Sequence, residues 1–217
     1  MTEQRLLVKK EGDFTYPIAF CRDFSALTQE IQNLPNNGKR LCVVTDSNVA
    51  PLFLKTVAEA LKETGREIYT YILPAGEQNK TLENVQGIYE FLIQNRFDRK
   101  DLLAALGGGV VGDMTGFAAA TYLRGIDFIQ IPTTLLAQVD SSIGGKTGVD
   151  FKQYKNMVGA FHQPLLVYLN VSTLKTLSDS EFACGMGEII KHGLIRSLEY
   201  SQWLTEHSKE ILERKED

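Results

Sequence analysis

The sequence predicts an α/β protein built on a mostly parallel, Rossmann-like sheet with helices on both faces. From residue 40 onwards, short apolar runs alternate with helical patterns of about ten to fifteen residues. Such alternation is typical of strand–helix–strand crossovers, whose strands lie parallel in a sheet covered on both faces. Residues 178–217 carry helical patterns only. We therefore expect an α/β domain over residues 1–177, followed by the start of an all-helical domain over residues 178–217.

Two strands are expected before the alternation begins, over residues 5–10 and 16–21. The sequence Glu-Gly-Asp between them is a hairpin signal, and Pro17 suggests that the second strand lies at an edge or begins there. An amphipathic helix is expected over residues 24–34, where the sequence Pro-Asn-Asn-Gly follows. This segment precedes the parallel part of the sheet.

The remaining elements follow from apolar runs, helical periodicity and turn signals. Residues 151–164 are expected to form a loop that is long for a compact domain, and such loops are often functional. Ser178 and Glu181 form a capping box that opens a helix, and residues 199–217 fit one charged amphipathic helix. Strands are expected at residues 40–45, 67–73, 102–106, 128–131 and 165–169, and helices at residues 50–63, 82–95 and 110–122, with a short helix opening on Thr133 and Thr134.

Composition and charge exclude several classes of protein. The chain has 217 residues, 43% of them hydrophobic, a formal charge of −4 and interspersed charges of both signs. This balance argues against nucleic acid or a membrane surface as the main partner. No apolar run reaches transmembrane length, and the first residues lack the apolar core of a signal peptide. Cys21, Cys42 and Cys184 have no metal-type spacing, which favours free thiols in a reducing cytoplasm.

A first glycine turn follows the predicted strand at residues 102–106. Gly107, Gly109 and Gly112 match the pattern G-x-G-x-x-G between a strand and a helix. Backbone amides at such a turn approach a ligand closely, and the free N–H groups of the helix favour an anion. We interpret residues 107–113 as a cradle for a dinucleotide pyrophosphate. The alternative is a tight turn and a helix that simply packs close to the sheet.

Polar residues also follow two earlier strands, at the edge where open α/β sheets bind ligands. Asp46 would accept hydrogen bonds from ribose hydroxyls and repel a 2′-phosphate, which favours NAD over NADP. It would equally serve as a cap of the next helix, and the spacing does not separate the two roles. Glu77 and Lys80 lie in the loop after the next strand. Taken singly, each is most often a solvated loop residue.

A second glycine turn, from Asp140 to Lys146, precedes the predicted long loop. Lys146, Lys152 and Lys155 gather cations beside this turn, which suits a phosphate or carboxylate ligand. His162 is expected to be a loop histidine bonded to backbone. On the following helix, Glu188, Lys191 and His192 share one stripe. Two ligands do not make a zinc site, so the spacing alone favours a solvated ion pair over a metal.

The motifs together resemble those of the 3-dehydroquinate synthase family. The resemblance is carried by PAGEQNKT, ALGGGVVGDMTGFAAATYLRG, IPTTLLAQVDSSIGGKTGVD, KNMVGAFHQP and GMGEIIKHG, and it covers nearly the whole chain. It implies a dehydroquinate synthase and glycerol dehydrogenase-like fold, with a zinc ligand at Glu188 and with His192 only as its neighbour. NAD contacts are implied at Asp46, Glu77, Lys80, Gly108, Gly109, Val110, Asp113, Thr133, Thr134 and Thr176, and substrate contacts at Arg124, Asp140, Lys146, Lys155, Asn156 and Lys191, with Lys146 and Lys155 counted in both sets.

The resemblance also implies an activity. Members are phosphorus–oxygen lyases of the shikimate pathway to aromatic amino acids, which convert the phosphorylated sugar acid DAHP into 3-dehydroquinate and phosphate. They use transient NAD-dependent oxidation, phosphate elimination, re-reduction and aldol closure. They require Zn²⁺, for which Co²⁺ is a possible substitute, and tend to form cytoplasmic homodimers. We expect Asp140 and Lys191 to orient the substrate and tune its proton transfers, rather than each acting as a lone general base.

One departure from the family limits the expectation for this chain. The other two zinc ligands of the family are histidines on a following helical domain, and no residue of this sequence stands in for them. Residues 1–217 alone are therefore expected to be weakly active or inactive. A metal-dependent polyol dehydrogenase of the glycerol dehydrogenase type, and a non-catalytic fragment that binds NAD, are the alternative functions.

Overall fold

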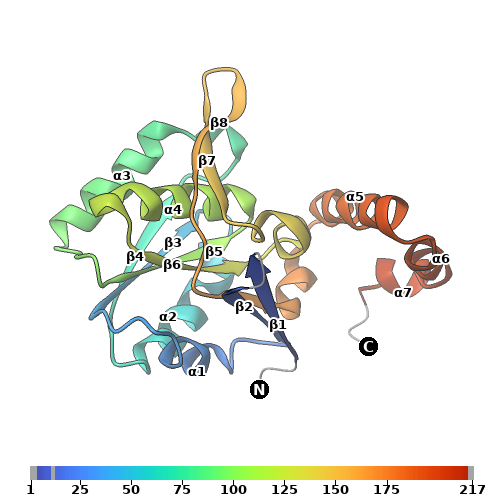
Figure 1. Cartoon of the computed structure of the whole chain (residues 1–217), viewed down its shortest axis with the longest axis horizontal. Coiled ribbons are helices and arrows are strands. Elements are labelled where there is room, and N and C mark those ends of the chain that lie inside the picture. Colours follow the sequence, from blue (N-terminus) through green and yellow to red (C-terminus); the bar gives the residue numbers. More distant parts are fainter. Residues whose placement is uncertain (1–3, 11–12, 215–217) are drawn as a thin grey trace.

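Seven strands form the central sheet of the computed structural model, which describes residues 4–10 and 13–214 (Figure 1). All neighbours pair parallel except the two strands at one edge, β1 and β2, which are antiparallel. The turn expected between these two strands falls at residues 11–12, outside the described residues. In spatial order the strands are β1 (Gln4–Lys10), β2 (Asp13–Cys21), β9 (Val167–Asn170), β6 (Asp127–Pro132), β5 (Leu102–Gly107), β3 (Arg40–Asp46) and β4 (Glu67–Leu73).

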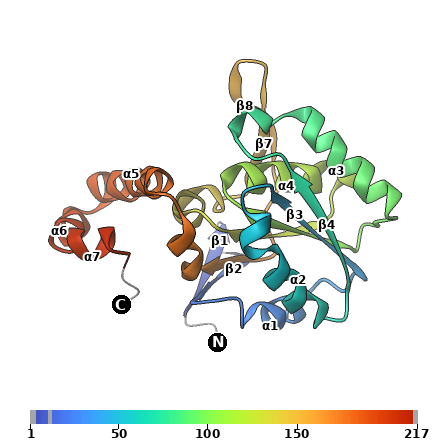
Figure 2. The same ribbon diagram turned by 180° about the vertical axis from the view of Figure 1, so that it is seen from behind.

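Helices cover both faces of the sheet, as the sequence predicts. Helices α1 (Leu27–Gln32) and α2 (Lys55–Lys62) lie on one face, and α3 (Leu82–Gln94) and α4 (Gly109–Thr121) on the other (Figures 1 and 2). Successive side chains of a strand point to opposite faces. Leu41 and Val43 of β3 therefore pack with the first pair of helices, and Cys42 and Val44 with the second. The central strands are apolar throughout because both of their faces are buried.

The strand order identifies the edge of the sheet where a ligand fits. The parallel strands from β3 onwards (β3, β4, β5, β6, β9), numbered along the chain, have the spatial order 2-1-3-4-5. The order therefore reverses between β3 and β5, and open α/β sheets bind ligands beyond the carboxyl ends of the strands at such a switch point. Asp46 ends β3 and Gly107 ends β5. The topology brings these two predicted site residues to the same crevice.

Three predicted helices differ in detail from the structure. The first is shorter than residues 24–34, because Asp23 accepts a hydrogen bond from the backbone of Ser25 and holds the chain in a turn before α1. The second begins with a π-helical turn (Ala50–Leu54) before α2. The segment expected as one helix over residues 199–217 is α6 (Leu198–Glu206) and α7 (Ser208–Leu212), broken at His207, whose ring Nδ1 donates a hydrogen bond to the Trp203 carbonyl.

The long loop predicted over residues 151–164 is wrong. The chain there forms an antiparallel hairpin of β7 (Lys146–Phe151) and β8 (Tyr154–Phe161), which stands out from the body at the top of Figure 1. Lys152 takes up the left-handed conformation that the tight turn requires, with φ of 56°. Gly148 and Gly159 lie opposite each other, and a β-carbon on Gly159 would lie 2.1 Å from the Thr147 carbonyl oxygen. Packing of β7 against α4 keeps this isolated ribbon ordered.

The predicted all-helical segment begins at Ser178, whose hydroxyl accepts a hydrogen bond from the Glu181 backbone and caps α5 (Asp179–Arg196). Helices α5, α6 and α7 lie together at one side of the α/β body (Figure 1). In the described part of the chain, no helix is both long and apolar enough to cross a membrane.

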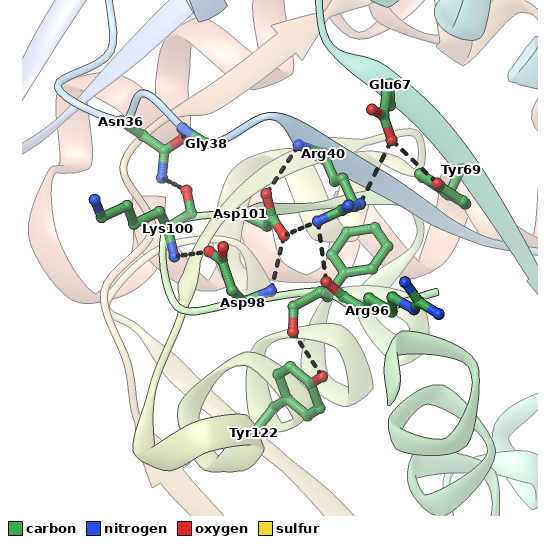
Figure 3. Close-up of polar contacts among 11 residues, drawn as sticks. Asn36, Gly38, Arg40, Glu67, Tyr69, Arg96, Asp98, Lys100, Asp101 and Tyr122 are labelled. Carbon is green, nitrogen blue, oxygen red and sulfur yellow. Dashed lines mark hydrogen bonds and ion pairs between the residues drawn. The ribbon is translucent and has the colours of Figure 1, made fainter. Parts of the chain in front are cut away.

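A buried polar network closes the amino edge of the sheet (Figure 3). Asp101, which is 1% exposed, accepts hydrogen bonds from the backbone N–H groups of Arg40 and Asp98 at 2.9 and 2.8 Å. The Arg40 guanidinium adds an ion pair to the same carboxylate at 3.7 Å. Gly38 passes so close that a β-carbon there would lie 2.0 Å from the carbonyl oxygen of Lys100. The network ties the start of β3 to the loop that leads into β5.

Candidate active site

The first glycine turn joins β5 to α4 and leaves the start of that helix open. Gly108 is the residue before the helix and has no side chain that could cap it. Within the described residues, the N–H groups of Gly109, Val110 and Val111 have no hydrogen-bond acceptor, and the first helical bond runs from Gly112 to Gly108. Free amides at a helix start, with the helix dipole behind them, bind an anion.

Space, not backbone conformation, explains why glycine occupies this turn. Gly107, Gly108 and Gly109 all lack a positive φ. A β-carbon on Gly108 would lie 3.0 Å from the Thr134 methyl, and one on Gly109 would lie 2.9 Å from the Ser141 hydroxyl. The packing alternative holds for Gly112, where a β-carbon would lie 2.5 Å from the Gln130 side chain on β6. The glycines therefore bring α4 close to the sheet and also keep the helix start uncovered.

Two buried hydroxyl groups lie beside this turn without a partner among the described residues. Thr133 is 3% exposed, and neither its hydroxyl nor that of Ser141 has a hydrogen-bond partner. Thr134, in contrast, caps the short helix that follows β6 by accepting a hydrogen bond from Ala137. Buried polar groups in proteins are nearly always hydrogen-bonded, so these two hydroxyls are suited to bind a ligand or a water molecule. Ser141 was not predicted, although it lies within the second glycine motif.

The predicted polar residues at or just after the ends of β3 and β4 already make hydrogen bonds and ion pairs with other parts of the chain. One carboxylate oxygen of Asp46, Oδ1, accepts hydrogen bonds from the backbone of Asn48 and Val49 at 2.8 and 2.9 Å. Asp46 thus caps the next turn, as its alternative role predicted, and its other oxygen has no hydrogen-bond partner within the described residues. Glu77, in the short helix η2 (Glu77–Asn79), pairs with Lys155 on the hairpin at 3.0 Å.

Lys80 is the centre of a buried polar contact between the hairpin and α4. Its side chain is 4% exposed and lies 2.6 Å from the carboxylate of Asp113 and 2.5 Å from the amide oxygen of Asn156. Burial raises the pKa of Asp113 above its usual value, and the nearby ammonium of Lys80 opposes that shift. Asn156, which accepts this hydrogen bond from Lys80, has a left-handed backbone conformation with φ of 56°. Three predicted site residues therefore form one contact.

A cavity of about 490 Å³ opens beside this contact. Asp113 and Asn156 line it together with Asp140 and Lys146, and Ser141 connects it to the first glycine turn. Its other wall is apolar and includes the exposed side chains of Met157 and Phe161. A cavity with a cation, carboxylates and an amide at one side suits a small polar anion.

Asp140 also belongs to a second cluster, with Glu188 and His192 of α5. One ligand atom from each of these residues lies within 4.8 Å of the others, which fits a metal ion. The helical spacing alone predicts no metal here, whereas the family resemblance implies Glu188 as a ligand and His192 only as its neighbour. The structure adds Asp140 from outside the helix, a contact that helical spacing does not show. Because Asp140 lines the cavity too, Lys146 and Glu188 lie on the same side of the molecule.

Close packing at Gly185 brings this cluster together. A β-carbon on Gly185 would lie 2.5 Å from the Leu135 side chain and 2.7 Å from the Leu136 backbone. Helix α5 therefore touches the segment that enters the π-helical turn η4 (Ala137–Ser141). Glu188 lies one helical turn beyond Gly185, as Asp140 lies beyond Leu136, so the contact aligns the two carboxylates.

Lys191 pairs with Glu188 one turn along α5. The hydrogen bond to Glu188 raises the pKa of the Lys191 ammonium, and the charge of Asp140 acts in the same direction. Lys191 is therefore held as a cation. A metal ion and Lys191 are alternative partners for the Glu188 carboxylate.

Two residues predicted to belong to the site, Arg124 and Thr176, are not shown to lie with the residues described above. Arg124 follows the far end of α4, which is 13 residues long, so it is about 20 Å along the helix from the first glycine turn. Thr176 ends the helical turn η5 (Val171–Thr176) and donates its hydroxyl proton to the Thr173 carbonyl. The roles of Arg124 and Thr176 stay predictions from the resemblance. His162, as expected, bonds to backbone through the Ile126 carbonyl.

Comparison with known proteins identifies the sequence family. The profile described as 3-dehydroquinate synthase N-terminal matches residues 70–184, more than half of the chain. The 3-dehydroquinate synthase of Acetivibrio thermocellus is 48% identical over 94% of this chain and 56% of its own length. That of Hydrogenovibrio crunogenus is 51% identical over 82% of this chain and 49% of its own length. The chain thus spans about half the length of the curated relatives it matches.

Solved structures agree on the fold. A 2-epi-5-epi-valiolone synthase from Streptomyces hygroscopicus, solved with NAD⁺ and Zn²⁺, is 28% identical, with a TM-score of 0.84 over 95% of this chain and 57% of its own. A 2-deoxy-scyllo-inosose synthase complexed with carbaglucose-6-phosphate, NAD⁺ and Co²⁺ is 29% identical, with a TM-score of 0.77 over 83% of this chain and 48% of its own. An iron-containing alcohol dehydrogenase of Thermotoga maritima, 20% identical with a TM-score of 0.65 over 81% of this chain and 51% of its own, shares the fold alone. With the family profile covering more than half of its residues, the chain belongs to the 3-dehydroquinate synthase family.

Proposed function

We propose that this chain is the nucleotide-binding part of a 3-dehydroquinate synthase, which converts DAHP into 3-dehydroquinate and phosphate. One observation carries the proposal. An open helix start with unpaired amides adjoins, through Ser141, a cavity lined by Lys146 and Asp140. A nucleotide site and a site for a phosphorylated sugar acid then share one wall, as a reaction between NAD and that sugar requires.

NAD is the cofactor that the first of these sites fits. The amides of Gly109 and Val110 would bind the pyrophosphate, and the unpaired hydroxyls of Thr133 and Ser141 would donate to its oxygens. The second carboxylate oxygen of Asp46 would accept a ribose hydroxyl across the switch point, and its charge disfavours the 2′-phosphate of NADP. Related cyclases solved with NAD⁺ support this assignment.

A divalent metal ion fits the cluster of Glu188, Asp140 and His192. Nitrogen and carboxylate oxygen are ligands that Zn²⁺ accepts, and neighbours solved with Zn²⁺ or Co²⁺ support the choice of metal. We propose Glu188 as the ligand from this chain, with His192 and Asp140 within reach. When bound, NAD would accept and return a hydride, and the metal ion would polarise the hydroxyl being oxidised.

The side chains around the cavity would hold and orient the substrate. Lys146 would pair with its carboxylate or phosphate, and Asn156 would donate a hydrogen bond from its amide nitrogen while its oxygen stays on Lys80. Lys191, which pairs with Glu188 when no metal ion is bound, would orient the substrate and tune its proton transfers rather than act as a lone general base. Asp140 faces both the cavity and the metal cluster, so it would orient the hydroxyl between them.

Separate binding titrations of the purified chain test the division into two sites. NAD and DAHP are titrated calorimetrically into the wild type and into Lys146→Ala. We expect the variant to bind DAHP at least about tenfold more weakly, the effect of losing one charge-assisted hydrogen bond. Its affinity for NAD should stay within about twofold of the wild type. Equal losses for both ligands, or no NAD binding by the wild type, contradict the proposal.

A turnover assay tests the reaction class. A 3-dehydroquinate synthase releases phosphate from DAHP without accumulating NADH, because the hydride is returned in the same cycle. A polyol dehydrogenase would accumulate NADH with glycerol and release no phosphate. We propose that residues 1–217 alone are weakly active or inactive, so the assay should show phosphate release far below an ordinary enzymatic rate. An ordinary rate would refute this last point.

The proposal extends to the domain boundary, the oligomeric state and the cellular compartment of the enzyme. We propose a domain boundary after residue 177, between the helical turn η5 and the helices α5 to α7. We also propose that the whole protein is a homodimer. The cytoplasm is its proposed compartment, in line with the free thiols of Cys21, Cys42 and Cys184.

A further inference from the structure

The second glycine turn is held from outside by a tyrosine far away in the sequence. The backbone N–H of Gly144 donates a hydrogen bond to the hydroxyl of Tyr16 at 3.0 Å, across 128 positions of the chain. Tyr16 is fully buried and belongs to β2, next to the edge of the sheet. The N-terminal strands thus contact the segment that leads to the cavity.

Two further contacts hold the same turn from the end of the hairpin. The backbone N–H of His162 donates to the Gly145 carbonyl at 2.8 Å, and the Gln163 amide donates to the Gly144 carbonyl at 3.2 Å. The His162 ring is fixed in turn, because its Nε2 lies 2.8 Å from the Ile126 carbonyl and the ring stacks on Phe128. A carbonyl only accepts, so Nε2 carries the proton.

The turn needs such support because of its composition. Gly144 and Gly145 have φ angles of 96° and 69°, in the region that favours glycine. Glycine is also the most flexible residue in the backbone, so a pair of them does not define a direction by itself. Lys146 follows immediately, begins β7 and lines the cavity with Asp140. A small rotation of the backbone in the turn would move the Lys146 ammonium away from the Asp140 carboxylate.

We propose that Tyr16 is a positioning residue for the substrate site, and that its hydroxyl fixes the direction in which Lys146 enters the cavity. The proposal rests on the substrate role proposed for Lys146. Tyr16 acts through Gly144 and touches neither substrate nor cofactor.

The hydroxyl of Tyr16 is not required by the packing of the core. The ring packs with Ile18, Val167 and Leu169, and a phenylalanine would fill the same space. Among the described residues, the partner of the hydroxyl is the N–H of Gly144. The oxygen atom therefore serves the glycine turn.

A pair of matched variants tests this role. Tyr16→Phe removes the hydroxyl that binds Gly144. Tyr168→Phe is the control, because Tyr168 is equally buried and its hydroxyl donates to the Asp23 carbonyl at 2.7 Å, away from the turn. We expect Tyr16→Phe to weaken DAHP binding about tenfold, the scale of one hydrogen bond, and to leave NAD affinity within about twofold. Tyr168→Phe should change neither affinity.

A double-mutant cycle with Lys146→Ala shows whether Tyr16 acts through that lysine. If it does, Tyr16→Phe has little further effect on DAHP affinity once Lys146 is gone. Additive losses would overturn the proposal, as would equal losses in the two tyrosine variants or unchanged DAHP binding in Tyr16→Phe.

Amide hydrogen exchange gives a result that does not depend on the proposed substrate. In Tyr16→Phe the amide of Gly144 should exchange faster by about tenfold or more, since its acceptor is lost, while Tyr168→Phe leaves it protected. Unchanged protection of Gly144 would overturn the proposal. If instead the wild type does not bind DAHP but the exchange result holds, the proposed function fails and the contact to the turn stands.

Discussion

At the scale of single residues, the buried pair of Lys80 and Asp113 shows how the site balances charge. The two groups lie 2.6 Å apart and largely out of water. Burial raises the pKa of Asp113, which means that the folded state favours its protonated form. Stability linked to this group is therefore present below its unfolded pKa of 3.8 and is lost as the pH rises through the folded pKa. Lys80 limits that loss.

Replacing Lys80 should make the chain more sensitive to pH. In Lys80→Met the pKa of Asp113 rises further, because the cation that favours its ionised form is gone. We expect the variant to lose about 3 kcal/mol of unfolding free energy at neutral pH, and progressively less as the pH is lowered towards 4 and Asp113 becomes protonated. Urea denaturation across this pH range measures the difference.

Lys155→Met is the matched control. Lys155 pairs with Glu77, but the two side chains are 70% and 43% exposed, so water screens the pair. The change in unfolding free energy should stay below about 1 kcal/mol at every pH. A constant difference between Lys80→Met and the wild type from pH 4 to pH 7 would contradict the account of Asp113.

The sequence motifs identify individual residues of the candidate site, but they do not show which of these residues contact one another. The motifs marked Lys80, Asp113 and Asn156 separately, but their common contact depends on a hairpin that was predicted as a loop. The two roles of Asp46 could not be separated by spacing, since capping and ligand binding use different oxygens of one carboxylate. Asp140 and His192 come from different elements, so helical periodicity could not reveal their meeting.

At the scale of elements, the packing of α5 on the η4 segment brings together Asp140, Glu188 and His192, the candidate metal ligands. Gly185→Ala would place a methyl group 2.5 Å from Leu135 and push the helix away. We expect a loss of about 1 to 3 kcal/mol in unfolding free energy from this overpacking. Co²⁺ affinity, followed by its visible absorption spectrum, should fall at least about tenfold, because Glu188 and His192 move away from Asp140.

Gly187→Ala on the same helix is the control. A β-carbon at Gly187 meets no atom within 4 Å, so the alanine fits without displacement. It should stabilise the helix by up to about 1 kcal/mol and leave Co²⁺ affinity unchanged. Equal Co²⁺ affinities for the two alanine variants would show that the contact at Gly185 does not set the cluster.

The elements that the sequence could not predict are those with weak hydrophobic patterns. Strands β3 and β5 are buried on both faces and show as continuous apolar runs. The strand β8 is almost wholly exposed, and two glycines face each other across the hairpin, so no alternation of apolar residues marks it. The break between α6 and α7 likewise depends on a contact of His207 with Trp203 and not on a proline or glycine.

At the scale of the whole molecule, the two ends of the parallel strands differ in role. The carboxyl edge carries the candidate site, and the amino edge carries the network around Asp101 (Figure 3). The alternation of strands and helices predicted a parallel sheet, and that prediction is confirmed. The order of the strands was not predictable, because it depends on long-range pairing such as that of β2 with β9.

Asp101→Asn should lower global stability without affecting the site. The amide would accept one of the two backbone hydrogen bonds and present a donor to the other, and the ion pair with Arg40 would lose its charge. We expect a loss of about 3 kcal/mol in unfolding free energy. The affinity for NAD, measured well below the midpoint of thermal unfolding, should stay within about twofold of the wild type.

Asp98→Asn is the corresponding control, because Asp98 accepts one backbone hydrogen bond, from Lys100, at an exposed position. It should cost no more than about 1 kcal/mol. If Asp101→Asn reduced NAD affinity strongly at a temperature where it is folded, the two edges of the sheet would not be independent.

The proposed nucleotide site at the switch point between β3 and β5 combines residues that are far apart in the chain, which has a consequence for synthesis. On the ribosome, Asp46 emerges long before Gly108, and Ser141 emerges later still, so a nascent chain cannot make all three proposed contacts with the nucleotide until Ser141 has emerged. A ligand stabilises only conformations that already possess its binding groups. The first strands must therefore be stabilised by their own apolar contacts, without the ligand, until the rest of the proposed nucleotide site has left the ribosomal exit tunnel.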